Sequence, residues 1–236
     1  MPKSVITEGR TSIEAIEKGL KELKASRNQV DVKILEEKKK SFFSILDPHI
    51  VKVELTLKEE KVDTPFEKKK KEDACKAVFP EAETFEAWEE FDEEKAEELL
   101  TLAGFTADKV EDVTLAEDEK GELLGAVLSV TSTEGYGGDI SFSLGILKDS
   151  TVSGIQILSI SETAGLGMRA KEESFYGQFT GKNAEKFSYT KTGASAEDEI
   201  DAISGATITT RAMTNGVNAG LSYFRDSLVK GGVIHE

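Results

Sequence analysis

The sequence predicts an α+β protein: a small β-α-β-β module at the N-terminus, followed by a larger domain in which helices flank a curved antiparallel sheet. Helical and alternating apolar patterns follow one another in the first 60 residues, and three β-rich runs occupy residues 123–160. The charge also changes sign, because residues 1–62 contain 13 basic and 11 acidic side chains, whereas residues 63–236 contain 17 and 34. Such a change often separates modules. We therefore predict a module over 1–62, a polar Lys-rich linker over 63–73 and a domain over 74–230.

The overall composition excludes several classes of function. The chain has 45 acidic and 30 basic residues, and its net charge of −15 disfavours binding to nucleic acid phosphates. A single cysteine, Cys75, excludes an internal disulfide, and two distant histidines, His49 and His235, exclude a His-rich metal site. The chain has neither the roughly 18 continuous apolar residues of a membrane span nor the apolar block of a signal peptide. We expect a soluble cytoplasmic protein that binds no nucleic acid and no metal.

The first module is predicted to run strand, helix, strand, strand. Residues 4–7 form a short strand, and Thr11 followed by Glu14 forms a capping box that starts a helix. Alternating apolar residues predict two half-buried strands, over 30–34 and 51–57. The apolar residues of the helix are spaced by three and four and form one face: Ile13, Ile16, Leu20 and Leu23.

The loop between the last two of these strands contains lysines at 38–40 followed by apolar residues. The apolar residues are Phe42, Phe43, Ile45 and Leu46. They either cap the small core or form an exposed basic and hydrophobic contact loop. With its EGRT, EAIEKGLKEL and VDVKILEE segments, the module resembles the N-terminal domain of the Jag family. Jag proteins carry RNA-binding domains further on, but nothing resembling those domains follows here, so we expect no RNA binding.

Two helices are predicted before the β-rich runs. The first follows Pro65 and stops at Pro80, and the lysines at 68–71 either form its solvated start or dock an acidic surface or an anionic lipid. The second lies over 90–104.

In the second helix, Leu99 and Leu102 are predicted to point inward and Gly104 to be the C-cap. The acidic stretch 81–98 that overlaps it either keeps the protein soluble or docks a positively charged partner.

Three runs then predict a curved antiparallel sheet. They cover residues 123–133, 140–147 and 155–160, and a glycine-rich turn at 135–139 separates the first two.

Residues 201–211 combine several hydroxyl side chains with a glycine and lead directly into a helix. Free N–H groups, the positive end of the helix dipole and several hydroxyl donors are what a phosphate requires. The alternative is an ordinary Ser or Thr N-cap, which needs a single hydroxyl. The helix is predicted from apolar residues spaced by three and four: Met213, Val217, Leu221, Phe224 and Leu228.

Residues 201–207, DAISGAT, resemble the flavinylation motif of FMN-binding domains, which attach FMN to a threonine through a phosphoester. Further pieces follow in the order of that family: KAVFP at 76–80, the glycine turn at 135–138 and ETAGLG at 162–167. The resemblance covers residues 72–230. The family includes the G subunit of the Rnf electron-transport complex and the C subunit of sodium-pumping NADH:quinone reductase.

The resemblance implies FMN as the cofactor, attached covalently to the hydroxyl of Thr207. Asp201 would serve the FMN transferase or the shape of the loop, Tyr136 is either an exposed turn residue or a flavin contact, and Gly137 would contact the cofactor. The residues around the phosphate would be Ser204, Gly205, Ala206, Thr209 and Thr210. The residues that border the flavin ring would be Glu162, Thr163, Leu166 and Gly167.

The resemblance also implies an electron carrier, or a subunit of an oxidoreductase complex, rather than a stand-alone enzyme. No side chain would act as a general acid or base. Redox proteins, including membrane-complex subunits, would be its partners, and an FMN transferase would mature it. Where relatives have a transmembrane helix this chain has the Jag-like module, which implies a soluble form that docks peripherally or diffuses freely. The alternative is a non-redox adaptor that keeps the FMN-binding fold as an interaction scaffold.

Overall fold

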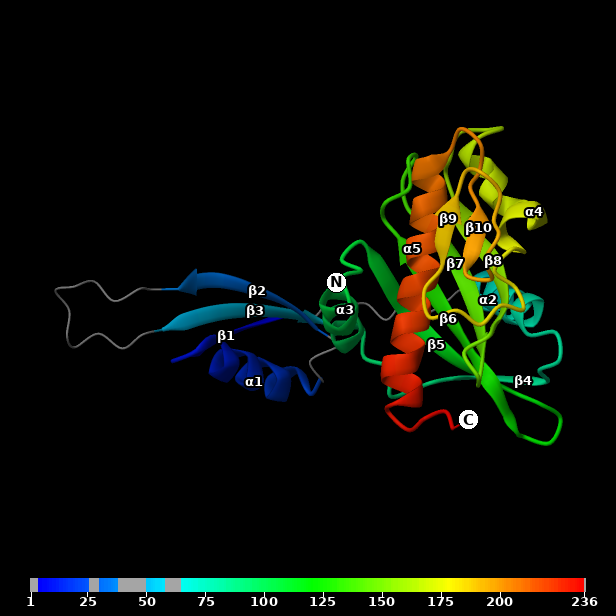
Figure 1. Cartoon of the computed structure of the whole chain (residues 1–236). Helices are drawn as coiled ribbons and strands as arrows, with labels where there is room; N and C mark the ends of the chain where they lie inside the picture. The colour runs from blue at the N-terminus through cyan, green and yellow to red at the C-terminus, as the bar shows by residue number, and fades with distance from the viewer. Residues whose placement is uncertain (1–3, 26–29, 38–49, 58–64, 236) are drawn as a thin grey trace. The chain divides into compact units, whose positions relative to one another are not determined.

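The computed structural model describes residues 4–25, 30–37, 50–57 and 65–235 (Figure 1). The chain forms two compact units, Met1–Asp63 and Thr64–Glu236. Helix α2 begins at Pro65, so most of the stretch that the sequence indicates as a linker belongs to this helix of the second unit. The apolar loop residues between 42 and 46 lie outside the described residues.

The first unit is a three-stranded antiparallel sheet with one helix packed against it. Its sheet order is β1-β3-β2, and the elements follow the predicted order strand, helix, strand, strand. The elements are β1 (Ser4–Gly9), α1 (Ser12–Leu23), β2 (Val30–Glu37) and β3 (Val51–Leu57).

Helix α1 starts at the predicted cap, and one residue of its predicted apolar face points away from the core. Thr11 Oγ1 accepts the N–H of Glu14 at 3.1 Å, as a capping box requires. The small residues Ala15 and Gly19 are buried, whereas Ile13 is 69% exposed. Of the four residues predicted to share one apolar face, Leu23 is buried and Ile16 and Leu20 pack against the core, so the prediction is wrong for Ile13 alone. The helix packs against the sheet along its row of small residues, which turns Ile13 toward solvent.

The second unit is built on a five-stranded antiparallel sheet in the order β4-β5-β6-β7-β8. A separate pair of short parallel strands, β9 and β10, precedes the last helix. The strands are β4 (Thr84–Ala87), β5 (Asp108–Glu117), β6 (Leu123–Ser132), β7 (Ile140–Leu147), β8 (Val152–Ile160), β9 (Ser188–Thr190) and β10 (Glu199–Asp201). The sequence pattern indicates β6, β7 and β8 but misses β5. A register shift between Val110 and Asp112 interrupts the alternation of buried and exposed residues in β5.

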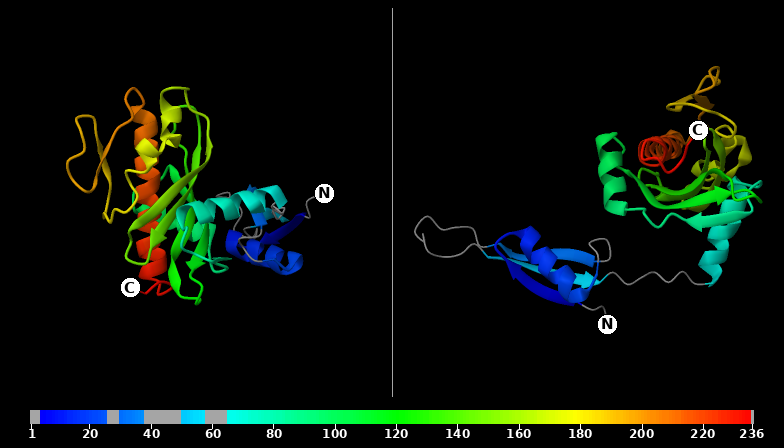
Figure 2. Two further views of the ribbon diagram at one scale, coloured as in Figure 1. Left: turned by 90° about the vertical axis from the view of Figure 1, so that its right-hand side faces the viewer. Right: turned by 90° about the horizontal axis from the view of Figure 1, so that it is seen from below.

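Helices cover both faces of this sheet (Figure 2). α5 (Thr207–Tyr223), which continues into a π-helical turn at Phe224–Val229, and α3 (Glu93–Leu102) lie on one face, while α2 (Pro65–Val78) lies on the other. The larger core, between α5 and the sheet, contains buried residues such as Phe142, Leu144, Met213 and Val217. A 3₁₀ turn (Gly167–Lys171) and α4 (Glu173–Tyr176) follow β8. The predicted α+β class is confirmed.

The inward face of α3 differs from the prediction. Leu100 is buried, but Leu102 is 90% exposed, so the prediction that Leu102 points inward is wrong. The helix begins after its N-cap Asp92 and packs through Ala96 and Leu100, four residues apart, which leaves Leu102 on the outer side. Ala103 is the C-cap, and Gly104 follows it with a φ of +89°.

Candidate functional site

A pocket of about 500 Å³ lies at the N-terminal end of α5, the upper end of that helix in Figure 1. Three segments far apart in the sequence form it: the glycine turn after β6, the loop after β8 and the loop that leads into α5. All of its lining residues except Ile208 are among those that the sequence indicates. They are Tyr136, Glu162, Thr163, Leu166, Gly167, Gly205, Ala206, Thr207, Ile208 and Thr209.

The start of α5 is open toward the pocket. The N-cap is Ala206, which makes no side-chain hydrogen bond to the first turn, so the structure does not show the ordinary Ser or Thr cap. The N–H groups of the first turn and the positive end of the helix dipole therefore remain available to an anion. Gly205 precedes the cap with a φ of +77°, a conformation that favours glycine. This turn brings the half-buried Thr207 to the pocket.

Glu162 joins two walls of the pocket. Its Oε1 accepts the N–H of Tyr136 at 2.7 Å, which ties the glycine turn to the loop after β8. On the other side, a Cβ placed on Gly167 would lie 2.6 Å from both Glu162 Oε2 and Thr209 Oγ1. Because Gly167 has no side chain, the Glu162 carboxylate and the Thr209 hydroxyl can both lie close to its backbone.

Two predicted phosphate neighbours have other places in the structure. The hydroxyl of Thr210 is buried, donates to the carbonyl of Ala206 at 2.9 Å and accepts the N–H of Ile203 at 3.0 Å, so it stabilises the helix start. Ser204 is exposed and lines a neighbouring hollow of about 210 Å³.

Asp201 shapes the loop rather than the pocket. Its Oδ1 accepts the N–H of Ala194 at 2.7 Å, and Gln178 holds its backbone by accepting from its N–H at 2.6 Å and donating to its carbonyl at 3.3 Å. Gly137 packs its backbone against the carbonyl of Ser161 and is outside the lining.

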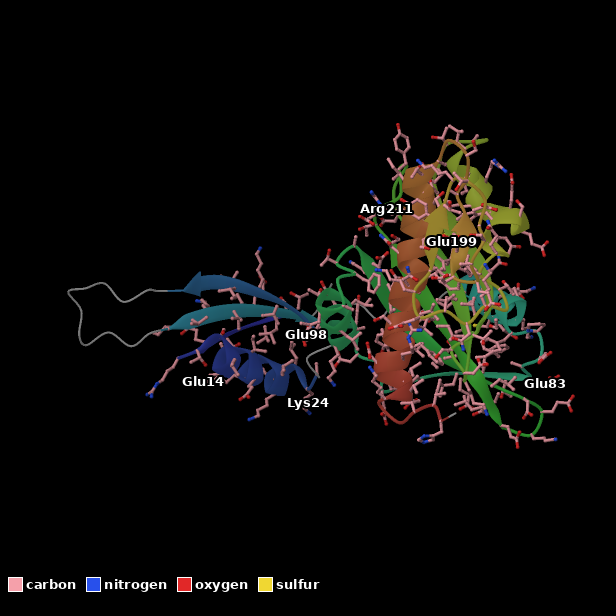
Figure 3. All side chains as sticks on the ribbon, in the orientation of Figure 1. Glu14, Lys24, Glu83, Glu98, Glu199 and Arg211 are labelled. Atoms are coloured by element: carbon pink, nitrogen blue, oxygen red, sulfur yellow. The ribbon has the colours of Figure 1, made fainter. Side chains whose placement is uncertain are left out.

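Sequence reasoning missed a polar cluster beside the pocket. Glu134 Oε2 accepts from Asn215 Nδ2 at 2.9 Å and lies 3.9 Å from Arg211 Nε. Figure 3 shows Arg211 near the N-terminal end of α5. The spacing of Thr207, Arg211 and Asn215 by four residues was a signal that could have found this cluster, because such residues share one face of a helix.

A buried carboxyl lies next to this cluster. Asp108 at the start of β5 pairs in register with Ser132 at the end of β6, and both are buried. Within the described part of the chain, Asp108 Oδ1 and Ser132 Oγ have no hydrogen-bond partner. Burial raises the pKa of Asp108 from 3.8 to about 6, while the nearby Ser132 hydroxyl lowers this pKa and the charge of Glu134 raises it.

The described residues contain neither a cluster suited to a metal ion nor a helix suited to crossing a membrane. No group of three or more His, Cys, Asp and Glu side chains in the described part of the chain is arranged to hold a metal ion. Among the same residues, none of the helices has the length and apolar character needed to cross a membrane.

Comparison with known proteins identifies the family of the chain. The G subunit of the Na⁺-translocating ferredoxin:NAD⁺ oxidoreductase complex of Acetobacterium woodii is 33% identical over 155 residues, which cover 65% of this chain and 73% of that protein. The chain belongs to the G-subunit family of ion-translocating oxidoreductase complexes. The Methanosarcina acetivorans member is 31% identical over 154 residues, 64% of this chain and 73% of that protein. The Clostridium ljungdahlii member, from a proton-translocating complex, is 36% identical over 115 residues, 47% and 62% of the two chains.

Two domain families match this chain, and each match falls within one of the two structural units. Residues 135–222 match the FMN-binding domain, and residues 7–57 match the Jag N-terminus, so both predicted resemblances are confirmed. The whole lining of the pocket falls within the first match. Among solved structures, Shewanella oneidensis NqrC is 21% identical with a TM-score of 0.41, covering 47% of this chain and 56% of that one.

Proposed function

We propose that this protein is an electron-transfer flavoprotein that carries FMN in the pocket at the start of α5, attached by a phosphoester to Thr207. The observation that carries the proposal is the position of Thr207. Its side chain lines the pocket at a helix N-terminus whose N-cap residue makes no side-chain hydrogen bond. A phosphate held there would accept from free backbone N–H groups and face the positive end of the helix dipole.

The residues present fit FMN in size and chemistry. The pocket volume of about 500 Å³ is within the usual range of roughly 300–1,000 Å³ for sites that bind small molecules. Tyr136, Leu166 and Ile208 are large apolar side chains exposed at the pocket, and they suit the flat face of a ring system. Glu162 and Thr209 add two polar groups, which can orient the polar edge of such a ring.

The chain's own residues hold and shield the cofactor in this proposal. The left-handed turn at Gly205 presents the Thr207 hydroxyl, and the buried Thr210 keeps that turn in shape through its bonds to Ala206 and Ile203. Bound FMN supplies reversible electron transfer through its ring. A covalent link prevents its loss by diffusion, so the protein can pass electrons repeatedly without rebinding the cofactor.

The proposed partners follow from the family. The named relatives are subunits of ion-translocating oxidoreductase complexes, and we infer that redox proteins, including subunits of such a membrane complex, exchange electrons with this chain. Covalent loading would require an FMN transferase that recognises the exposed loop before α5. Because the FMN-binding domain lies within unit Thr64–Glu236, this unit is the part expected to carry the redox function.

Intact mass spectrometry of the full chain coexpressed with an FMN transferase tests the proposal. Wild type should gain one FMN-sized addition, and its yellow colour should survive acid precipitation. Thr207→Val should lose the addition while remaining folded, because Val keeps the shape and removes only the hydroxyl. Thr180→Ala removes an exposed hydroxyl of the same unit that lies outside this loop and outside the pocket lining, and it should retain the addition.

A wild-type protein that stays colourless would contradict the carrier and favour a non-redox adaptor. An addition that persists in Thr207→Val would place the attachment at another hydroxyl, and peptide mapping would identify it.

A further inference from the structure

The face of α5 that carries Thr207 also carries a cationic side chain, Arg211. Thr207, Arg211 and Asn215 are spaced by four residues, so they lie on one face of the helix, with neighbouring Cβ atoms about 5–6 Å apart. The glycine turn runs along this face. Glu134, directly before the turn, contacts Asn215 and Arg211, and Tyr136 within the turn lines the pocket together with Thr207.

The lining of the pocket contains a carboxylate and no cationic side chain among the described residues. Glu162 is the charged residue of the lining, and the remaining lining residues are apolar, hydroxyl-bearing or glycine. A phosphate group would therefore add negative charge beside a carboxylate. A nearby guanidinium would compensate for that repulsion, since it donates several charge-assisted hydrogen bonds to phosphate oxygens.

Arg211 has the freedom to serve this purpose. Its Nε lies 3.9 Å from Glu134 Oε2, which is longer than the roughly 2.7–2.9 Å of a charge-assisted hydrogen bond. Its side chain is half exposed, and the guanidinium offers five N–H donors in a planar fork. One helical turn of about 5.4 Å separates it from Thr207, a distance that an arginine side chain spans.

We propose that Arg211 binds the phosphate of the FMN attached to Thr207, with Glu134 as the residue that positions its guanidinium. The proposal rests on the proposed function. Glu134 itself accepts a hydrogen bond from the side-chain Nδ2 of Asn215, so it can keep the arginine stem beside the pocket while the outer donors of the guanidinium turn to the phosphate. Arg211 is then a phosphate-binding residue, in addition to the backbone N–H groups of the helix start.

A comparison of FMN with riboflavin, which lacks the phosphate, isolates this contact. The background is Thr207→Val, in which both ligands can bind only non-covalently, and dissociation constants are measured by flavin fluorescence. Adding Arg211→Gln should raise the dissociation constant of FMN by roughly three- to tenfold, as expected for a half-exposed charged hydrogen bond. The constant for riboflavin should change less than about twofold, because the ring contacts remain.

Arg169→Gln in the same background is the matched control. Arg169 is also a half-exposed arginine near this end of the unit, but it pairs with Glu172 at 3.3 Å and lines the neighbouring hollow. It should leave both constants unchanged. Equal weakening of FMN and riboflavin by Arg211→Gln, or no weakening of either, would overturn the proposal.

A second measurement applies to the covalently loaded protein. The ³¹P resonance of the phosphodiester should shift in Arg211→Gln and stay in place in Arg169→Gln. An unchanged resonance in a loaded Arg211→Gln protein would contradict the role of Arg211 alone. A wild type without any FMN-sized addition would instead contradict the proposed function, so the two failures are distinguishable.

Discussion

Gly167 shows how one atom sets the shape of the pocket. A Cβ at this position would lie 2.6 Å from Glu162 Oε2 and from Thr209 Oγ1. The glycine therefore lets the loop after β8 approach α5 until these two polar groups border the same space. A methyl group would have to push them apart.

We expect Gly167→Ala to lower the amount of covalent FMN per chain by at least about tenfold. Overpacking of this kind costs about 1–3 kcal/mol, and the displaced groups are those that line the pocket. Gly121→Ala is the control, because Gly121 lies in the turn between β5 and β6 with a φ of +74°, and a Cβ added there would meet no atom of the described residues within 4 Å. It should lose stability through backbone strain but keep its FMN. Intact mass and thermal unfolding measure the two effects, and normal loading of Gly167→Ala would contradict this account.

The buried carboxyl of Asp108 makes the stability of the folded protein depend on pH. Its folded-state pKa of about 6 lies above its ordinary value of 3.8, because the carboxylate is buried. The folded state therefore binds the proton more tightly than the unfolded state. The resulting contribution to stability is complete below pH 3.8, decreases as pH rises through about 6, and is absent above that.

Asp108→Asn should make the protein more stable than wild type at pH 8 by about 1–3 kcal/mol. The amide carries no charge to bury, and its Nδ2 can donate to Ser132 Oγ, which lacks a partner among the described residues. The gain should shrink toward zero at pH 4, where the wild-type carboxyl is protonated. Urea unfolding at both pH values measures it. A difference between the two proteins that does not vary with pH would show that Asp108 has an ordinary pKa.

At the scale of elements, helix α5 separates the pocket from the acidic stretch 81–98. The 17 residues of α5 span about 24 Å. The pocket lies at its first residue, whereas Phe91 of the acidic stretch packs edge to face on Tyr223, its last, with ring centroids 6.1 Å apart. Charges on this stretch are therefore too far from the pocket to contact a bound flavin. We expect them to act on an approaching partner through long-range steering.

Replacing Glu89, Glu90, Glu93 and Glu94 by Gln should change the salt dependence of electron exchange but not the flavin potential. Steering of a basic partner weakens as salt screens it, with a Debye length of about 8 Å at 0.15 M. Stopped-flow oxidation of the reduced flavoprotein by ferric cytochrome c, a basic probe, should be less sensitive to salt in the variant than in wild type. Identical salt dependence would leave the acidic stretch as a solubility feature. A shifted potential would contradict the distance argument.

At the scale of the whole molecule, the two units have separate cores. The core of the first unit contains Ala15, Leu23, Val30, Val51, Val53 and Leu55. All residues that line the pocket, and the cluster around Glu134, belong to the second unit. The described residues of the site therefore all lie within Thr64–Glu236.

We expect a chain that begins at Thr64 to load FMN to the same extent as the full chain and to keep its reduction potential. Its five-stranded sheet and the helices on both faces remain intact. The first unit alone should fold with low stability, because its core is small. Intact mass, potentiometry and circular dichroism test these expectations. Loss of FMN from the shortened chain would show that the first unit contributes to the site.

The sequence by itself determined the features that depend on close neighbours along the chain. These are the cap at Thr11, the β-rich runs of β6 to β8, and the run from Gly205 to Thr207, which is part of the motif at 201–207. The family resemblance also indicated the lining residues after β8, because the ETAGLG motif at 162–167 identifies them although their spacing alone does not.

Only the tertiary structure decided which of these side chains face the pocket. Thr209 and Thr210 are adjacent and chemically identical, yet one lines the pocket and the other stabilises the helix start, because packing against the sheet sets the rotation of α5. Leu102 likewise points outward because α3 packs through Leu100. The contact between Glu134 and Asn215 joins residues 81 positions apart, and no local pattern encodes a pairing that exists only when the glycine turn lies along the helix.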